Sequence, residues 1–279
     1  MSTGSALVAV HAAVALFAFA ALFGKWIALP ATAIVLGRTA FAALALVLAL
    51  RIRGRPAGTP TFALAGNGAI LALHWVSFFA AVQSASVAVA LLGYASFPLF
   101  VLLLERHPAP RARTVERYAT GALVIAGLLV IVPAFSWSDR ASQGLAWGIV
   151  SGFTFAWLAL RNRSLVAGDE PARIALWQNA VAAGCLLPIA ASEAGRSWPS
   201  TQDFALLAVL GVGCTALAHT LFIASMRRIS AHAASVVAAL EPVYGIALAA
   251  WLLGEVPGPR TLAGAALIVA AALIASRRV

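Results

Sequence analysis

The amino-acid sequence predicts an all-α membrane protein with ten transmembrane helices, arranged as two inverted five-helix repeats with both termini in the cytoplasm. Three observations support this fold class: a very apolar composition, a motif that recurs after 144 residues, and arginines concentrated in alternate loops. Of the 279 residues, 62% are hydrophobic and 10% are charged, whereas about 25% of residues are charged in a soluble domain. The apolar runs also lack the alternation of polar and apolar residues that is typical of membrane β-barrel strands.

Ten apolar runs are suited to cross a hydrocarbon core of roughly 30 Å as helices. They cover residues 6–26, 31–50, 61–82, 86–104, 117–134, 143–160, 172–192, 204–225, 232–253 and 260–276. Turn-forming residues separate most of these runs, as at Gly54-Arg55-Pro56 and Pro257-Gly258-Pro259. Glycine and proline at such positions favour loops between helices.

Two of the expected helices contain a proline in the middle of an apolar run. Phe97-Pro98 interrupts residues 86–104, and Glu241-Pro242 interrupts residues 232–253. Proline in a helix frees a backbone carbonyl and bends or breaks the helix. We therefore predict hinges at Pro98 and Pro242. We assign residues 1–136 to the first repeat, with spans one to five, and residues 137–279 to the second, with spans six to ten.

The arginines indicate how the helices are oriented. The termini and the even-numbered loops carry fourteen arginines: Arg51, Arg53, Arg55, Arg106, Arg111, Arg113, Arg117, Arg161, Arg163, Arg173, Arg227, Arg228, Arg277 and Arg278. The opposite side carries four basic residues: Lys25, Arg140, Arg196 and Arg260. The positive-inside rule then places both termini in the cytoplasm. Because this asymmetry explains the net charge of +10, we expect no nucleic-acid partner. Five spans per repeat is an odd number, so the two repeats must enter the membrane from opposite faces.

Motifs for chemistry are lacking in the sequence. It contains no HExxH, CxxC, Walker or GxSxG motif, so we expect no enzyme activity, no metal site and no cofactor. Cys185 and Cys214 both lie in apolar runs, and we predict no disulfide. A passive pore and a membrane-embedded enzyme are the other classes considered. Selectivity filters are built from repeated rings of ligands, and this chain has none.

Several motifs resemble those of the EamA family of the drug/metabolite transporter superfamily. In the second half they are Leu240-Glu241-Pro242-Val243-Tyr244, Leu252-Leu253-Gly254-Glu255 and Gly264; in the first half they are Leu36-Gly37-Arg38, Phe97-Pro98-Leu99 and the run from Gly121 to Gly127. The first half has no counterpart of Gly254-Glu255, which suggests a structural role for Glu255 at a loop. The aromatic-rich composition is most similar to YddG-type exporters of aromatic amino acids.

The resemblance implies a secondary transporter that exports small amphipathic metabolites, above all amino acids including aromatic ones. It would work by alternating access through a central cavity, as carriers built from inverted repeats do. Other metabolites and cationic drugs are the alternative cargoes. The implied partners are a small-molecule substrate, the lipid bilayer and, as a candidate coupling ion, protons. The implied location is a bacterial inner membrane, as a multi-pass protein. The oligomeric state is either a monomer or a homodimer, and the sequence does not distinguish the two.

Two charged residues lie deep within expected spans. Arg38 is about eight residues from the outer face and Glu241 about ten from the inner face. Ionisable residues inside a membrane are functional candidates by default. We expect Arg38 to bind a substrate carboxylate, and Glu241 to take up protons or bind an amine. Alternatively, a partner neutralises each charge, or Arg38 extends toward the interface.

Uncharged candidates for the cavity lie in several spans. His74, Trp75 and Phe78 share the third span, and His219 lies in the eighth; these two helices line the cavity in the resembled family. The remaining candidates are Tyr94, Trp157, Trp177 and Asn179. Aromatic rings would stack on a flat substrate or hold a cationic group. The alternatives are hydrogen bonds between helices for the histidines and Asn179, and an interfacial belt for the Trp and Tyr residues.

Overall fold

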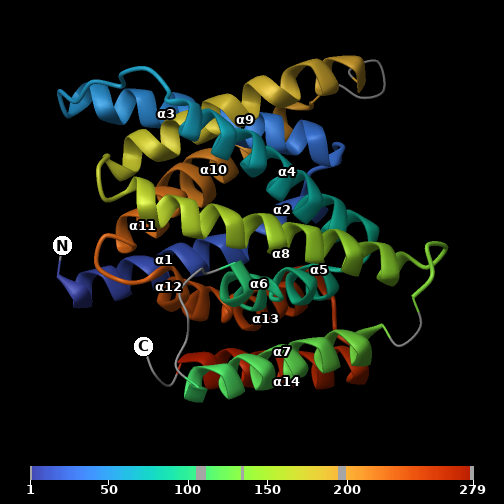
Figure 1. Ribbon diagram of the computed structural model, residues 1–279. Coiled ribbons are helices and arrows are strands. Elements are labelled where there is room, and N and C mark those ends of the chain that lie inside the picture. The colour runs from blue at the N-terminus through green and yellow to red at the C-terminus, as the bar shows by residue number, and fades with distance from the viewer. Residues whose placement is uncertain (1, 105–110, 133–134, 194–198, 277–279) are drawn as a thin grey trace.

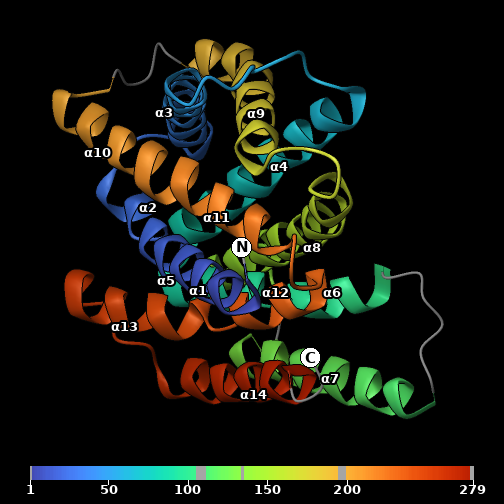
Figure 2. The same cartoon turned by 90° about the vertical axis from the view of Figure 1, so that its left-hand side faces the viewer.

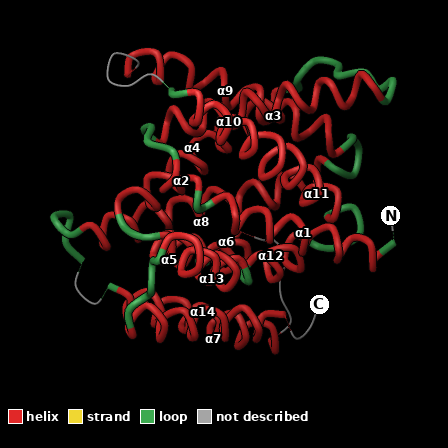
Figure 3. The backbone as a smooth tube through the Cα atoms, turned by 180° about the vertical axis from the view of Figure 1, so that it is seen from behind, coloured by secondary structure: helices red, strands yellow, loops and turns green. Residues whose placement is uncertain are grey.

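The computed structural model describes residues 2–104, 111–132, 135–193 and 199–276. Within these ranges every regular element is helical (Figure 3). The elements are α1 (Thr3–Ala20), α2 (Phe23–Trp26), α3 (Ala31–Ile52), α4 (Phe62–Ser84), α5 (Val87–Tyr94), α6 (Phe97–Leu104), α7 (Arg111–Ile131), α8 (Arg140–Leu165), α9 (Pro171–Glu193), α10 (Thr201–Gly211), the π-helix η1 (Val212–Leu217), α11 (Ala218–Ser225), α12 (Ala231–Ala238), α13 (Glu241–Leu253) and α14 (Pro259–Ser276).

The predicted all-α membrane fold is confirmed. Each of the ten predicted spans coincides with one helix or with consecutive helices. Among the described residues, six helical segments are long and apolar enough to cross a membrane: Thr3–Trp26, Ala31–Ile52, Phe62–Ser84, Arg140–Leu165, Pro171–Glu193 and Thr201–Ser225. Shorter apolar helices cover Val87–Val101, Ala119–Ile131, Glu241–Leu253 and Pro259–Ala271.

Both spans with a proline near the middle are interrupted where the sequence predicts a break, whereas α9 continues through Pro188 near its end. α5 ends at Tyr94 and α6 begins at Phe97, while α12 ends at Ala238 and α13 begins at Glu241. Pro98 and Pro242 are therefore each the second residue of a new helix. Proline is well tolerated in a first helical turn, because the N–H that it lacks would have no partner there. Each break thus converts an unfavourable mid-helix proline into a favourable helix start.

The helices form layers between two outer pairs (Figures 1 and 2). α3 packs beside α9 at one end of the molecule, and α7 packs beside α14 at the other. Gly127 of α7 and Gly264 of α14 allow this second pair to approach closely: a Cβ added to either glycine would lie within 3 Å of the carbonyl oxygen of the other. Small residues of this kind let membrane helices pack backbone to backbone.

Packing between the two halves of the chain follows a reciprocal pattern. α1 packs on α11, α12 and α13, and α8 packs on α4, α5 and α6. Likewise α3 packs on α10, and α9 packs on α4. The first helix of each half therefore contacts the third span and the broken helix of the other half. As a result, the inner helices of both halves surround one central region.

Three glycines fit α8 closely against the first broken helix. A Cβ at Gly148 would lie 2.9 Å from the Cα of Gly93, and a Cβ at Gly152 would lie 2.8 Å from the carbonyl oxygen of Tyr94. These contacts fix the position of Tyr94 relative to α8.

Asp139 caps the start of α8. Hydrogen bonds from Ser142 hold the pKa of the Asp139 carboxyl below its ordinary value.

Candidate functional site

A buried cavity lies among the inner helices of both halves. Its volume is about 30 Å³, which is room for about two water molecules. Residues from α1, α3, α4, α5, α8, α11 and α13 line it: Phe17, Ala20, Arg38, Leu71, His74, Trp75, Phe78, Tyr94, Phe155, Leu158, Asn162, His219, Phe222 and Glu241. Seven of the ten predicted substrate-binding residues are among them. These seven are Arg38, His74, Trp75, Phe78, Tyr94, His219 and Glu241.

Arg38 is 1% exposed, and the other half of the chain supplies its hydrogen-bond partners. Its Nε donates to Thr215 Oγ1 at 2.9 Å, and Nη2 lies 3.5 Å from the carbonyl oxygen of Cys214. The guanidinium carbon lies 4.0 Å from the ring centroid of Trp75 and 5.3 Å from that of Phe79. A cation over an aromatic face is stabilised by the negative face of the ring. Arg38 is thus held in place without an ion pair among the described residues.

The π-helix supplies both of these partners. η1 carries Cys214 and Thr215, and Thr215 Oγ1 donates to the carbonyl oxygen of Leu210 at 2.7 Å. A π-helical turn widens the hydrogen-bonding pattern and is frequent at functional sites. Here it places a hydroxyl and a carbonyl group against the guanidinium. No feature of the sequence predicts this turn.

Glu241 opens α13 and is 3% exposed. Its Oε2 is buried and has no hydrogen-bond partner within the described part of the chain. Tyr94, the last residue of α5, is a close neighbour of this carboxyl group in the cavity. Each of the two helix breaks therefore places a polar side chain on the cavity wall.

The two histidines lie on neighbouring helices with different partners. His74 Nδ1 lies 3.0 Å from both the carbonyl oxygen and the Oγ of Ser151. The contact to the carbonyl, which only accepts, favours a proton on Nδ1, and in that neutral tautomer Nε2 is an acceptor. His219 Nδ1 faces the amide Nδ2 of Asn179 at 3.4 Å. That amide donates, so the neutral ring of His219 carries its proton on Nε2.

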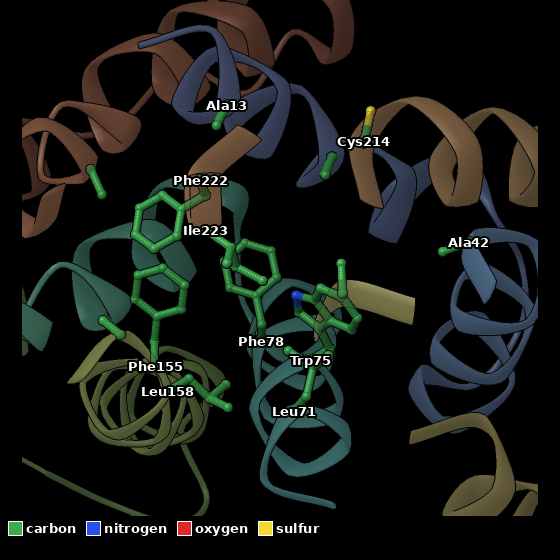
Figure 4. Close-up of a cluster of buried hydrophobic side chains, with 14 of the residues drawn as sticks. Ala13, Ala42, Leu71, Trp75, Phe78, Phe155, Leu158, Cys214, Phe222 and Ile223 are labelled. Atoms are coloured by element: carbon green, nitrogen blue, oxygen red, sulfur yellow. The ribbon is translucent and has the colours of Figure 1, made fainter. Parts of the chain in front are cut away.

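Six of the fourteen lining residues are Phe, Trp or Tyr, and Figure 4 shows four of them, Trp75, Phe78, Phe155 and Phe222. Phe155 of α8 and Phe222 of α11 face each other with ring centroids 5.3 Å apart. Tyr94 lies 5.3 Å from Phe155 and 5.9 Å from Phe78, and Trp75 lies 5.7 Å from His219. These separations are typical of interacting aromatic pairs. The wall can accept a flat apolar group.

Three predicted residues lie outside the cavity lining. Trp157 is 40% exposed, because it lies two residues from Phe155 and so points to the opposite side of α8. Trp177 donates from Nε1 to the carbonyl oxygen of Ala57 at 2.9 Å and anchors the loop between α3 and α4. Asn179 lies behind His219 and also donates to the carbonyl oxygen of Ala175 at 2.8 Å.

Sequence reasoning missed several lining residues. Phe155, Leu158 and Asn162 lie at helical spacing from Ser151 on one face of α8, and this periodicity could have identified them. The predicted span ends at residue 160, short of Asn162, whereas α8 continues to Leu165. The remaining missed residues are Phe17, Ala20, Leu71 and Phe222. Leu71 lies one turn before His74 and Phe222 one turn after His219, so helical spacing could have identified these two as well; Phe17 and Ala20 are apolar residues of α1 that no predicted site residue accompanies.

Metal-binding side chains, cysteines and Glu255 are the other groups that could form a site. Within the described ranges, no group of three or more His, Cys, Asp or Glu side chains is arranged to hold a metal ion. Cys185 is exposed, Cys214 is buried, and both are free. Glu255, outside the cavity, accepts from Val87 N at 2.9 Å and lies 3.6 Å from Lys25 Nζ. It therefore has the structural role at a loop that the sequence suggests.

The fold and its long apolar helices define a multi-pass membrane protein. The EamA-like transporter family matches residues 142–277. The pseudopaline exporter CntI of Pseudomonas aeruginosa is 30% identical over 261 residues, which cover 89% of this chain and 87% of that protein. The chain therefore belongs to the EamA-like transporter family, within the drug/metabolite transporter superfamily. This is a family of transporters and not of enzymes.

Two further proteins are similar over most of their length. An uncharacterized transporter of Archaeoglobus fulgidus is 28% identical over 226 residues, which cover 80% of this chain and 79% of that protein. A solved crystal structure covers 100% of both chains with a TM-score of 0.77 at 20% identity, which supports the fold alone. The family is thus confirmed, while the similarity to YddG-type exporters in particular stays a prediction.

Replacing Thr215 with Val tests how Arg38 is held. The substitution removes the acceptor of the Arg38 Nε. We expect the free energy of unfolding to fall by about 1.5–3 kcal/mol, as for hydrogen bonds to charged groups. The measurement is the unfolding transition of the purified protein in detergent. Thr39→Val is the matched control, because the Thr39 hydroxyl bonds only carbonyls of its own helix, at Val35 and Leu36. Equal losses in both variants would show that Thr215 does not hold the guanidinium.

Proposed function

We propose that the protein is a secondary transporter that exports small amphipathic metabolites, chiefly amino acids including aromatic ones. The observation that carries this proposal is the central cavity, which Arg38 and Glu241 line together with aromatic side chains. Two oppositely charged groups in one buried site suit a zwitterion, because burial strengthens electrostatic interactions. The pseudopaline exporter similar to this chain supports export of an organic metabolite.

Each part of an amino acid has a matching group in the cavity. Arg38 would bind the carboxylate, since a guanidinium offers two parallel N–H donors. Glu241 would bind the amine, and its unpartnered Oε2 is free to accept. The rings of Phe155 and Phe222 would hold the side chain of the substrate. His74 Nε2 offers a further acceptor, and His219 Nε2 offers a further donor.

Alternating access fits the small volume of the cavity. A volume of about 30 Å³ is too small for an amino acid, so the helices must move before a substrate enters. At one end Lys25 donates to the carbonyl oxygen of Ala85 at 2.9 Å and pairs with Glu255. At the other end Arg173 donates to the carbonyl oxygens of Ala57 and Thr59. We infer that these contacts open alternately as the helices bend at Pro98 and Pro242.

Two inverted repeats, at residues 1–136 and 137–279, would provide this motion. The 144-residue offset supports the division, because it relates α5 to α12 and the start of α6 to that of α13. The reciprocal packing of the two halves also supports it. The arginine distribution favours cytoplasmic termini, and the bacterial relative favours an inner-membrane location. Protons are the candidate coupling ion, with Glu241 as the group that takes them up.

A cationic drug is the second candidate cargo. The unpartnered carboxylate oxygen of Glu241 and the surrounding rings favour it, since both attract cations. Arg38 disfavours it, because its positive charge lies in the same cavity and would repel a cation. A zwitterion satisfies both charges, and we therefore prefer an amino acid.

Uptake of radiolabelled Phe, Trp and Thr into proteoliposomes tests the proposed function. We expect saturable uptake, fastest for the aromatic amino acids, with a rate that changes when a proton gradient is imposed. Saturation and counterflow would distinguish a carrier from a pore. Liposomes without protein provide the control. If none of these amino acids is taken up, the amino-acid proposal is wrong, although the family assignment remains.

Substitutions in the cavity should reduce transport without unfolding the protein. For Glu241→Gln and His74→Ala we expect uptake at least about tenfold slower, as when one partner of a buried charged or hydrogen-bonded contact is lost. Gel filtration in detergent checks that each variant is folded. Trp157→Leu is the matched control, because Trp157 lies on the outer side of α8 and should leave uptake unchanged. Normal uptake in both cavity variants would exclude these residues from the mechanism.

A further inference from the structure

One end of the cavity adjoins a cluster of three buried carboxamides. We call Asn67, Asn162 and Gln178 the amide cluster; they come from α4, α8 and α9. Asn162 lines the cavity one helical turn beyond Leu158, and Asn67 lies one turn before Leu71, which also lines it. Their side chains are 1%, 2% and 0% exposed in chain order.

Helix packing brings the three amides to the same level. α4 and α8 pack against each other, as do α4 and α9. A Cβ added to Gly68, the neighbour of Asn67, would lie 2.9 Å from the carbonyl oxygen of Gln178. Gln178 Nε2 donates to Asn162 Oδ1 at 2.6 Å. Gln178 and Asn162 are therefore joined by a hydrogen bond, Asn162 reaches the cavity, and Asn67 lies at the same level on the adjacent helix.

The hydrogen bonds within the amide cluster are incomplete. In the part of the chain that the structure describes, Asn67 Nδ2 and Gln178 Oε1 are buried and have no partner. Buried polar groups are nearly always hydrogen-bonded, so an unpartnered pair requires an explanation. One atom is a donor and the other an acceptor, and none of the three side chains carries a charge. A neutral group that both donates and accepts, such as another carboxamide, is the complementary ligand.

A chain of contacts runs from Arg38 as far as Asn179, which follows Gln178 on α9. Arg38 lies over Trp75, the Trp75 ring contacts His219, and His219 faces Asn179, the neighbour of Gln178 in sequence. Trp75 and Asn67 are eight residues apart on α4, which corresponds to about 12 Å along the helix axis. A single amino acid is too short to bridge this distance. Two linked residues can, since each extended residue spans about 3.5 Å and a terminal side chain adds to this length.

We propose that the amide cluster is a second, neutral subsite, which binds a distal carboxamide of an elongated substrate whose carboxylate is held by Arg38. The inference rests on the proposed function, because it takes Arg38 as the carboxylate site. The substrate class would then be compounds of two linked amino-acid units with a neutral hydrogen-bonding end. The aromatic wall between the two ends would contact the apolar middle of the molecule.

A pair of dipeptides tests the subsite in proteoliposomes. L-glutaminyl-L-phenylalanine carries a distal carboxamide, and L-leucyl-L-phenylalanine has a hydrocarbon of similar size in its place. For the unmodified protein we expect the glutaminyl peptide to be transported with a kcat/KM higher by at least about tenfold, as for sites built to hydrogen-bond their substrate. Labelled Phe is measured in parallel.

Two variants and one control identify the residues responsible. Asn67→Leu and Asn162→Leu should bring the ratio of the two dipeptides close to one. Asn67→Leu should lower the unfolding temperature less than Asn162→Leu, because Asn67 Nδ2 has no partner within the described ranges, whereas Asn162 loses the hydrogen bond from Gln178. Thr154→Val is the control, since the Thr154 hydroxyl bonds only carbonyls of its own helix, at Val150 and Ser151, and the ratio should not change.

Each outcome has a defined meaning. A dipeptide ratio that collapses only in the two amide variants supports the subsite. An unchanged ratio in both folded variants, or transport of Phe without preference for the glutaminyl peptide, overturns the subsite and leaves the proposed function standing; bound water would then satisfy the amides. Failure to transport Phe and both peptides overturns the proposed function and the subsite together.

Discussion

A buried positive charge is the constraint on which the centre of this molecule depends. A guanidinium inside a membrane costs several kcal/mol unless polar or aromatic groups surround it. The chain meets this requirement with the Trp75 ring on α4 and the Thr215 hydroxyl on η1. Close packing makes the arrangement possible: a Cβ at Gly211 would lie 2.8 Å from the carbonyl oxygen of Arg38. The helices that hold Arg38 therefore also shape the cavity.

The two broken helices perform equivalent tasks in the two halves. Each starts a new helix with proline as its second residue, and each places a polar residue at the cavity, Tyr94 before one break and Glu241 after the other. A side chain at a break can face the centre without distorting a regular helix. The same breaks leave short helices that pack against α1 and α8 through small residues. The two broken helices thus serve both the packing around the cavity and the proposed motion.

The sequence predicts the fold well and the site in part. Long apolar runs and mid-run prolines identify the spans and both breaks, because hydrophobic length and missing N–H groups act locally. Arg38 and Glu241 are identifiable because charge in an apolar run is costly. In contrast, the π-helix and the hydrogen bond between Asn162 and Gln178 depend on how distant helices pack. Trp157 and Phe155 lie on opposite sides of α8, and the helical spacing of Phe155, Leu158 and Asn162 is the sequence signal that separates the two sides.

The central claim is that Arg38 and Glu241 bind the two charged ends of one substrate. Calorimetric titration of the purified protein with L-phenylalanine, phenethylamine and 3-phenylpropionate tests it most directly. Phenethylamine lacks the carboxylate, and 3-phenylpropionate lacks the amine. The account predicts that phenylalanine binds at least about tenfold more tightly than either analogue, because each loses a charge-assisted contact. Equal affinity for phenylalanine and phenethylamine would contradict a carboxylate site at Arg38.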